Sequence, residues 1–227
     1  MAAPILVFDL DGTLVHTAPD LLDSLNHCLA LEDIAAADPK ALSAYVGQGS
    51  RVMIERALEA RRQSLPSERL DVLQAAFLEH YVSNMPGESR FYAGAERVMD
   101  YFATQGFLLA VCTNKLEAMS KRLIDKLGAA ERFAAICGGD TFDFRKPDPR
   151  HLVGTIEMAG GNPSRAVMIG DSRADIDAAK AAGIPVIAVD FGYSVQHVRE
   201  LEPSRVVSHY DEVTPELIDQ MLRAAAL

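Results

Sequence analysis

Two aspartates stand at the end of the first apolar run of the chain. The run Ile5–Phe8 is followed directly by Asp9, and Asp11 comes after one further residue, with Gly12 next. In an extended chain the side chains of residues i and i+2 point to the same side, so both carboxylates face one volume. Carboxylate oxygens are the ligands that Mg²⁺ prefers in proteins. The pair therefore predicts a cation site at the tip of a buried strand.

Three more polar clusters follow other apolar runs. Thr113 and Asn114 come after "FLLAVC", and Lys146 lies beyond "AAIC" in the stretch "KPDP". Asp171 and Asp175 come after "AVMI". If these runs are parallel strands, their carboxyl ends meet at one edge of the sheet, where ligands bind in open α/β folds. We therefore expect all four clusters to converge on one small volume.

The residue types in these clusters are those of a phosphoryl-transfer site. Asp171 and Asp175 add carboxylate oxygens to the predicted Mg²⁺ site, and Lys146 supplies a fixed cation. The hydroxyl of Thr113 and the N–H groups at the start of the following helix can donate to an anion. Phosphoryl transfer depends mainly on stabilising charge on oxygen and on aligning the attack. The sequence thus predicts phosphate chemistry at the ends of the strands.

Six short aliphatic runs carry these clusters or lie beside them. Their apolarity is continuous rather than alternating, which indicates strands that are covered on both faces, as in a parallel sheet. Helical stretches that stop at Gly106, Gly128 and Gly183 alternate with the runs, and glycine commonly ends a helix. The pattern predicts a three-layer, doubly wound, Rossmann-like α/β core. The predicted strands are 5–8, 107–112, 134–137, 166–169, 185–189 and 205–208.

The region from 16 to 88 departs from this alternation. It contains no convincing strand, and its apolar residues recur at helical spacing, as in the stripe Leu21, Leu25 and Leu29. An all-helical block placed directly after the first strand is expected to be an inserted cap domain. The expected division is an α/β core of residues 1–15 and 89–227 and a helical cap of residues 16–88.

Composition and charge restrict the partners. The chain has 227 residues, of which 49% are hydrophobic, enough for a sizeable core. Its 32 acidic and 22 basic residues give a net charge of −10, which disfavours nucleic acid and anionic membranes as partners. The three cysteines show no paired spacing, and no stretch has the pattern of a signal peptide or a membrane span. We expect a cytoplasmic monomer or homodimer that acts on a small phosphorylated metabolite.

Taken together, the four clusters resemble the motifs of the haloacid dehalogenase superfamily. "DLDGTL", "TN", "KPDP" and "GDSRAD" occur in that family's order, each after the matching strand, and the helical insertion stands where the family places its caps. The resemblance covers nearly the whole chain. It implies a Mg²⁺-dependent phosphatase that works through an aspartyl-phosphate intermediate.

The resemblance also implies a role for each residue. Asp9 is expected to be the nucleophile. Asp11 is expected to protonate the leaving oxygen and then to deprotonate the attacking water. The implied metal site comprises Asp9, Asp11 (through its backbone carbonyl), Asp171 and Asp175 (directly or through water), and the implied phosphate site comprises Thr113, Asn114 and Lys146.

Within the superfamily, the "VGQG", "TAPD" and "FGY" stretches look most like the phosphoglycolate phosphatase group. Phosphoglycolate carries a carboxylate beside its phosphate, and the amides of a glycine loop together with an arginine could bind this second anion. The resemblance thus implies 2-phosphoglycolate as the substrate. A turn between two helices with a surface arginine is the alternative. The expected substrate-binding residues of the cap are Gly47, Gln48, Gly49 and Arg51.

Other activities remain open at this point. The superfamily also contains sugar-phosphate phosphatases, pyrophosphatases and phosphomutases. A receiver-like signalling module is an alternative from a different class, although Asp11 supplies a means to discharge Asp9 that such a module does not need. Two purely structural interpretations also remain open. Asp175 could be an exposed acid on a helix, and Thr113 with Asn114 could serve as a helix cap.

Overall fold

Six parallel strands form the central sheet of the protein. The computed structural model describes residues 3–38 and 49–224, and the strands follow the order β5–β4–β1–β6–β7–β8. Each pairing in this order is parallel, and every run predicted as a strand belongs to the sheet. The prediction of a doubly wound α/β core is confirmed. The strands are β1 (Ile5–Phe8), β4 (Leu108–Cys112), β5 (Ala135–Cys137), β6 (Ala166–Gly170), β7 (Val186–Val189) and β8 (Arg205–Val207).

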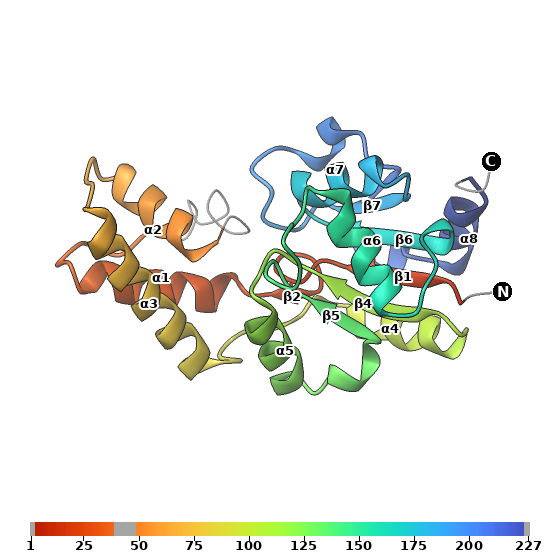
Figure 1. The fold of residues 1–227 in the computed structure, drawn as a ribbon, viewed down its shortest axis with the longest axis horizontal. Helices are drawn as coiled ribbons and strands as arrows, with labels where there is room; N and C mark the ends of the chain where they lie inside the picture. The colour runs from red at the N-terminus through yellow and green to blue at the C-terminus, as the bar shows by residue number, and fades with distance from the viewer. Residues whose placement is uncertain (1–2, 39–48, 225–227) are drawn as a thin grey trace. The chain divides into compact units, whose positions relative to one another are not determined.

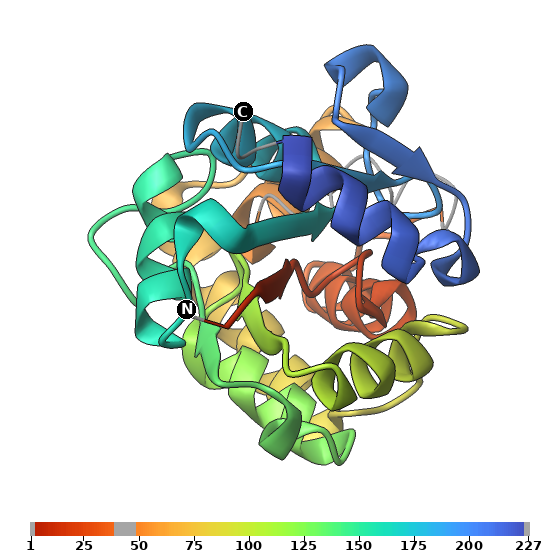
Figure 2. The same ribbon diagram turned by 90° about the vertical axis from the view of Figure 1, so that its right-hand side faces the viewer.

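Helices cover both faces of this sheet (Figure 2). α4, α5 and α8 lie on one face, and α6 and α7 lie on the other. This division follows from right-handed crossovers, because the chain moves outward from β1 to β4 and β5 and then returns to β6 on the other side of β1. The helices are α4 (Ala95–Thr104), α5 (Glu117–Lys126), α6 (Pro149–Met158), α7 (Arg173–Ala181) and α8 (Pro215–Ala224).

The central position of β1 determines where the polar clusters meet. All four residues of β1 are fully buried between the two helical layers, which explains its unbroken apolar sequence. Phe8, at the end of the strand, pairs with Val111 of β4 and Ile169 of β6. The segments that follow these three residues therefore leave the sheet side by side at its carboxyl edge.

A second compact unit is helical. Thr17–Arg90 form this unit, and Met1–His16 together with Phe91–Leu227 form the α/β unit. In the helical unit, α3 packs against both α1 and α2, and Leu25, Leu73 and Phe77 lie in its interior. A role of this unit as a cap stays a prediction. Its helices are α1 (Ala18–Ala30), α2 (Ser50–Glu59) and α3 (Ser67–Asn84) (Figure 1).

The remaining elements are short. Strands β2 (Val15–His16) and β3 (Arg90–Phe91) pair in a separate two-stranded sheet. None of the helices in residues 3–38 and 49–224 combines the length and the apolarity that a membrane crossing requires. The 3₁₀-helices are η2 (Ala130–Arg132), η3 (Pro163–Arg165), η4 (Val198–Leu201) and η5 (Tyr210–Glu212).

One carboxylate ties the two ends of the helical unit together. Asp20, in the first turn of α1, accepts backbone N–H bonds from Glu88 at 2.8 Å and Ser89 at 2.9 Å, and it also accepts the hydroxyl of Ser89. Gly87 has a φ of 55°, and a Cβ atom there would lie 2.3 Å from an oxygen of Asp20. Asp20 therefore closes the insertion by fixing the last residues of the unit to its first helix.

Removing this carboxylate should destabilise the helical unit. Asp20→Ala leaves two N–H groups without their acceptor, so we expect a loss of about 1–3 kcal/mol in the free energy of unfolding. Urea denaturation followed by circular dichroism measures this loss. Glu79→Ala on the exposed side of α3 is the control, and equal midpoints for the two variants would contradict the role of Asp20.

Candidate active site

The first site residue lies at the tip of the central strand. Asp9 directly follows β1, and its backbone N–H donates to the carbonyl of Ile169 at 2.9 Å, which continues the pairing with β6. The chain then turns sharply at Gly12, whose φ is 79°. A Cβ atom at Gly12 would lie 2.6 Å from Oδ2 of Asp171. Glycine is needed here both for the left-handed backbone and for the close approach of the two acidic segments.

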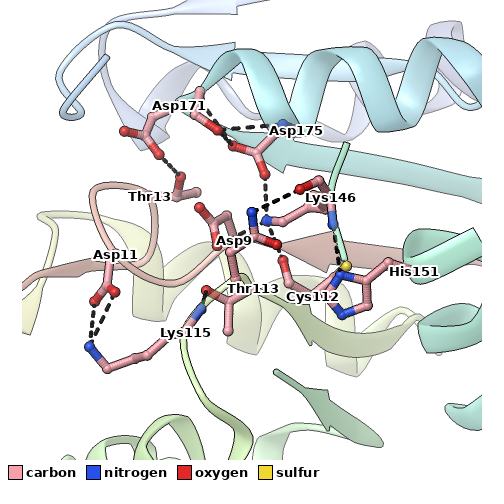
Figure 3. Close-up of polar contacts among 12 residues, drawn as sticks. Asp9, Asp11, Thr13, Cys112, Thr113, Lys115, Lys146, His151, Asp171 and Asp175 are labelled. Atoms are coloured by element: carbon pink, nitrogen blue, oxygen red, sulfur yellow. Dashed lines mark hydrogen bonds and ion pairs between the residues drawn. The ribbon is translucent and has the colours of Figure 1, made fainter. Parts of the chain in front are cut away.

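Three carboxylates meet behind this turn (Figure 3). Asp9, Asp171 and Asp175 each offer an oxygen, and the three oxygens lie within 4.8 Å of one another. The residues are 8%, 3% and 0% exposed, respectively. Asp175 is thus not an exposed helical acid, and the structure corrects that alternative. Asp175 lies in the first turn of α7, which begins at Arg173.

Lys146 offsets the negative charge of two of these acids. Its Nζ lies 3.0 Å from Oδ1 of Asp9 and 2.5 Å from Oδ1 of Asp175. It also donates to the carbonyl of Cys112 at 2.6 Å. Burial alone would lower the pKa of Lys146, but the charges of Asp175 and Asp9 raise it well above its ordinary value. Lys146 is therefore a permanent cation inside the site.

Asp171 is held by two donors that the sequence patterns did not reveal. The hydroxyl of Thr13 donates to Oδ1 of Asp171 at 2.9 Å, and the backbone N–H of Tyr193 donates to Oδ2 at 2.7 Å. Thr13 belongs to "DLDGTL" and Tyr193 to "FGY", so the signal lay in stretches already noted for other reasons. A Cβ atom at Gly192 would lie 2.2 Å from the Cβ of Asp171, which explains the glycine before Tyr193.

Asp175 is fixed by its own helix. Ser172 caps α7 and shares a capping box with Asp175, in which each residue accepts a hydrogen bond from the other's backbone. Oδ2 of Asp175 accepts the N–H of Ser172 at 3.0 Å and its hydroxyl at 2.6 Å, while Oδ1 faces Lys146. Asp175 thus differs from Asp171 in that one of its oxygens pairs with a buried ammonium and the other accepts two hydrogen bonds.

The crowding of acids raises their proton affinity. Burial raises the pKa of Asp9 to about 6, with Lys146 opposing the shift. Burial, together with the charges of Asp9 and Asp175, raises the pKa of Asp171 to about 8. Oδ1 of Asp9 is buried and accepts no hydrogen bond from any residue that the structure describes, although it lies close to Lys146. The charge of Lys146, and not a hydrogen bond, therefore holds this oxygen in place.

Thr113 and Asn114 lie at the end of β4, beside Asp9. Thr113 is 2% exposed, and its backbone N–H donates to the carbonyl of Cys137 at 3.0 Å. Asn114 donates from Nδ2 to the carbonyl of Lys146 at 2.9 Å, and its Oδ1 accepts nothing within the described part of the chain. Neither residue caps a helix, since the N-cap of α5 is Leu116. The helix-cap alternative is therefore wrong.

A second lysine pairs with the second aspartate. Nζ of Lys115 lies 3.2 Å and 3.1 Å from the two oxygens of Asp11. The two side chains are 7% and 13% exposed. The sequence patterns did not single out Lys115, although it directly follows Thr113 and Asn114. The α/β unit thus brings together two lysines and four aspartates, and the two uncompensated negative charges fit one divalent cation.

The sequence also predicts that four residues of the helical insertion bind the substrate. Gly47 and Gln48 lie outside the described residues. Gly49 has a φ of 97° and precedes α2. Arg51 donates to Glu55 at 3.1 Å, to Ser67 at 3.0 Å and to Asp71, all of which belong to the same helical unit. Its role in substrate binding stays a prediction.

Comparison with known proteins identifies the family. The family described as "Haloacid dehalogenase-like hydrolase" matches residues 6–189 of this chain. A phosphoglycolate phosphatase of Mesorhizobium japonicum is 58% identical over 225 residues, which cover 99% of each chain. The chain belongs to the haloacid dehalogenase-like hydrolases. A phosphoglycolate phosphatase of Agrobacterium fabrum is 48% identical over 99% of this chain and 96% of its own. With relatives of this identity, this haloacid dehalogenase-like hydrolase is a phosphatase.

Solved structures share the fold over nearly the whole chain. A crystal structure described as a predicted phosphoglycolate phosphatase from Haemophilus somnus has a TM-score of 0.87 at 26% identity and covers 93% of this hydrolase and 96% of that chain. A β-phosphoglucomutase from Clostridium difficile has a TM-score of 0.78 at 19% identity, with 99% of each chain covered. The second likeness concerns the fold alone.

A divalent cation should stabilise this hydrolase more at high pH than at low pH. The raised pKa values of Asp9 and Asp171 mean that bound protons stabilise the folded state fully only below about pH 4. This stabilisation is lost as the pH rises through about 6 and about 8. Calorimetry at about pH 5 and about pH 9 should therefore show a larger rise of the unfolding midpoint with Mg²⁺ at the higher pH. Asp171→Asn should lose most of this rise, and a rise that is larger at the lower pH would contradict the cation site.

Proposed function

We propose that the protein is a Mg²⁺-dependent phosphomonoester hydrolase that acts through an aspartyl-phosphate intermediate, with 2-phosphoglycolate as its substrate. The observation that carries this proposal is the buried carboxylate of Asp9. It stands at the carboxyl end of the central strand, Lys146 lies 3.0 Å from its Oδ1, and that oxygen accepts no hydrogen bond from the described residues. A nucleophilic oxygen needs this combination of a fixed position and an unused lone pair.

In the first step, the carboxylate oxygen of Asp9 attacks phosphorus in line with the leaving oxygen. Thr113 and Asn114, beside Asp9 at the end of β4, offer a hydroxyl and an amide to the phosphoryl oxygens. Lys146 holds Asp9 in place and offsets the negative charge that the phosphate brings into a site already rich in carboxylates. These groups belong to buried segments of the sheet edge, so their geometry is fixed before the substrate binds.

Asp11 moves the protons. It protonates the leaving oxygen during the attack and then takes a proton from the water that hydrolyses the acyl phosphate on Asp9. The chain turns at Gly12, and Asp11 and Lys146 lie on opposite sides of Asp9 (Figure 3). Asp11 also distinguishes a hydrolase from a receiver-like module, because it discharges the phosphorylated aspartate.

The acidic cluster would hold Mg²⁺ through a carboxylate oxygen of Asp9, the backbone carbonyl of Asp11 and a carboxylate oxygen of Asp171. Asp175 would support these ligands from behind, since its Oδ1 pairs with the ammonium of Lys146 and its Oδ2 accepts two hydrogen bonds from Ser172. When bound, the cation supplies charge neutralisation for the phosphoryl group and the crowded carboxylates. Thr13 and the Tyr193 N–H orient Asp171 toward the ion.

The choice of substrate rests on the relatives. Two phosphoglycolate phosphatases, at 58% and 48% identity, align with 99% of this chain, so the likeness includes the helical unit as well as the chemical motifs. Identity of this extent across the insertion supports the same substrate class. A sugar-phosphate phosphatase or phosphomutase activity is the second candidate.

A panel of small phosphomonoesters tests the substrate. We expect 2-phosphoglycolate to have the highest kcat/KM with Mg²⁺, by about tenfold or more over sugar phosphates, because its carboxylate adds a charged contact. Phosphate release and the sugar-phosphate products are both measured, so that an isomerised sugar phosphate would reveal a mutase. A panel in which 2-phosphoglycolate ranks among the poor substrates would reject this substrate and leave the hydrolytic chemistry standing.

Asp11→Asn tests the proton transfer. The change keeps the shape of the side chain but removes the acid and base, so kcat should fall by about 10²–10⁴-fold. The midpoint of thermal unfolding should stay close to that of the wild type. Asp219→Asn, an exposed change on α8, is the control and should keep full activity. A folded Asp11→Asn enzyme with near-normal kcat would refute the role of Asp11.

A further inference from the structure

The proposed chemistry assigns no role to one buried cation, Lys115. Lys146 pairs with Asp9 and Asp175, whereas Lys115 contacts both oxygens of Asp11 at 3.2 Å and 3.1 Å. Figure 3 shows the two lysines on opposite sides of Asp9. A surface lysine would have an exposed side chain, but that of Lys115 is only 7% exposed. Burying an ammonium group is costly, so its position indicates a purpose.

The backbone of Lys115 is fixed by the loop that follows β5. The N–H of Gly139 donates to the carbonyl of Lys115 at 2.8 Å, and Asp140 accepts the N–H of Glu117 at 2.7 Å. A Cβ atom at Gly138 would lie 2.2 Å from the backbone nitrogen of Glu117. The loop and the segment 114–117 therefore pack backbone to backbone. This packing aims the side chain of Lys115 at Asp11.

We propose that Lys115 is the specificity-determining residue that binds the carboxylate of the substrate, exchanging its bond to Asp11 for a bond to this second anion. The inference rests on the proposed function. The leaving oxygen of phosphoglycolate must lie next to Asp11, which protonates it. Only one methylene separates that oxygen from the substrate carboxylate. The carboxylate therefore comes within reach of the ammonium that now contacts Asp11.

Two other cations, Lys146 and Arg51, have partners elsewhere. Lys146 is enclosed by Asp9, Asp175 and the carbonyl of Cys112. Arg51 is engaged by Glu55 and Asp71 within its own helical unit. A substrate carboxylate entering beside Asp11 would meet another carboxylate, and Lys115 is placed to compensate this repulsion.

The exchange also gives a physical reason for selectivity. In the resting site, both oxygens of Asp11 are occupied by Lys115. An anionic substrate can draw the ammonium to itself, which leaves an oxygen of Asp11 able to take up from water the proton that it then delivers to the leaving oxygen. A neutral ester offers the ammonium nothing in return, so Asp11 stays engaged. Selection for a second negative charge then acts on the reacting geometry as well as on binding.

Three phosphate esters that differ in one terminal group test this inference. 2-Phosphoglycolate carries a carboxylate, 2-hydroxyethyl phosphate a hydroxyl and 2-aminoethyl phosphate an ammonium. We expect the wild-type kcat/KM to fall in that order. Lys115→Met should lower the ratio of 2-phosphoglycolate to 2-hydroxyethyl phosphate by about 10²-fold, because a buried charge pair is lost. It should also raise the relative rate with 2-aminoethyl phosphate.

Matched variants separate charge from folding. Lys115→Arg keeps the charge and should keep most of the preference, whereas Lys115→Gln should behave like Lys115→Met and replaces it if that variant unfolds. Lys126→Met, an exposed change at the end of α5, should leave the ratio unchanged. Circular dichroism melts verify that each variant is folded.

The outcomes distinguish the two proposals. A wild-type enzyme that prefers 2-phosphoglycolate, with variants that keep this preference or lose activity equally on all three esters, would overturn the role of Lys115 alone. A wild-type enzyme that hydrolyses the three esters equally would overturn both the substrate and the role of Lys115. A preference that disappears in Lys115→Met and Lys115→Gln and survives in Lys115→Arg supports the inference.

Discussion

The ion pairs of Lys146 are the interaction on which the site depends. Asp9, Asp171 and Asp175 lie within one small buried volume, and carboxylates so placed repel one another and lose their hydration. Lys146 reaches two of them from a loop that is distant in sequence and is anchored on the carbonyl of Cys112. The remaining acid, Asp171, keeps a raised pKa of about 8, mainly through burial. The cluster therefore lacks positive charge, which the proposed divalent cation would supply.

The fold supplies this arrangement through its topology. Because β1 lies between β4 and β6, the segments after three strands leave the same edge of the sheet, and "KPDP" joins them from beyond β5. Close backbone approaches at Gly12 and Gly192 let the acidic segments touch without side chains between them. Two lysines then contact different aspartates, Lys146 beside Asp9 and Lys115 beside Asp11.

The sequence allowed the sheet and the motif residues to be predicted, because continuous apolar runs and paired acids leave strong local patterns. It did not reveal α6 and α8, although Gly160, whose φ is 75°, directly follows the C-cap residue Ala159 of α6. Nor did it reveal the roles of Thr13 and Lys115, since a hydrogen bond across 158 residues has no local signature. Asp175 seemed equally suited to the surface, and only the tertiary fold shows that its carboxylate lies inside, bonded to Lys146 and Ser172.

Chemical trapping of the intermediate tests the account most directly. Sodium borohydride reduces an acyl phosphate to an alcohol, so a turnover mixture that is quenched in acid and then reduced should contain homoserine in place of Asp9. Peptide mass spectrometry locates the change, and the account predicts it at Asp9 alone, dependent on substrate and Mg²⁺. An unmodified Asp9 during rapid turnover, or the modification at Asp11 or Asp171 instead, would contradict the central claim that Asp9 accepts the phosphoryl group.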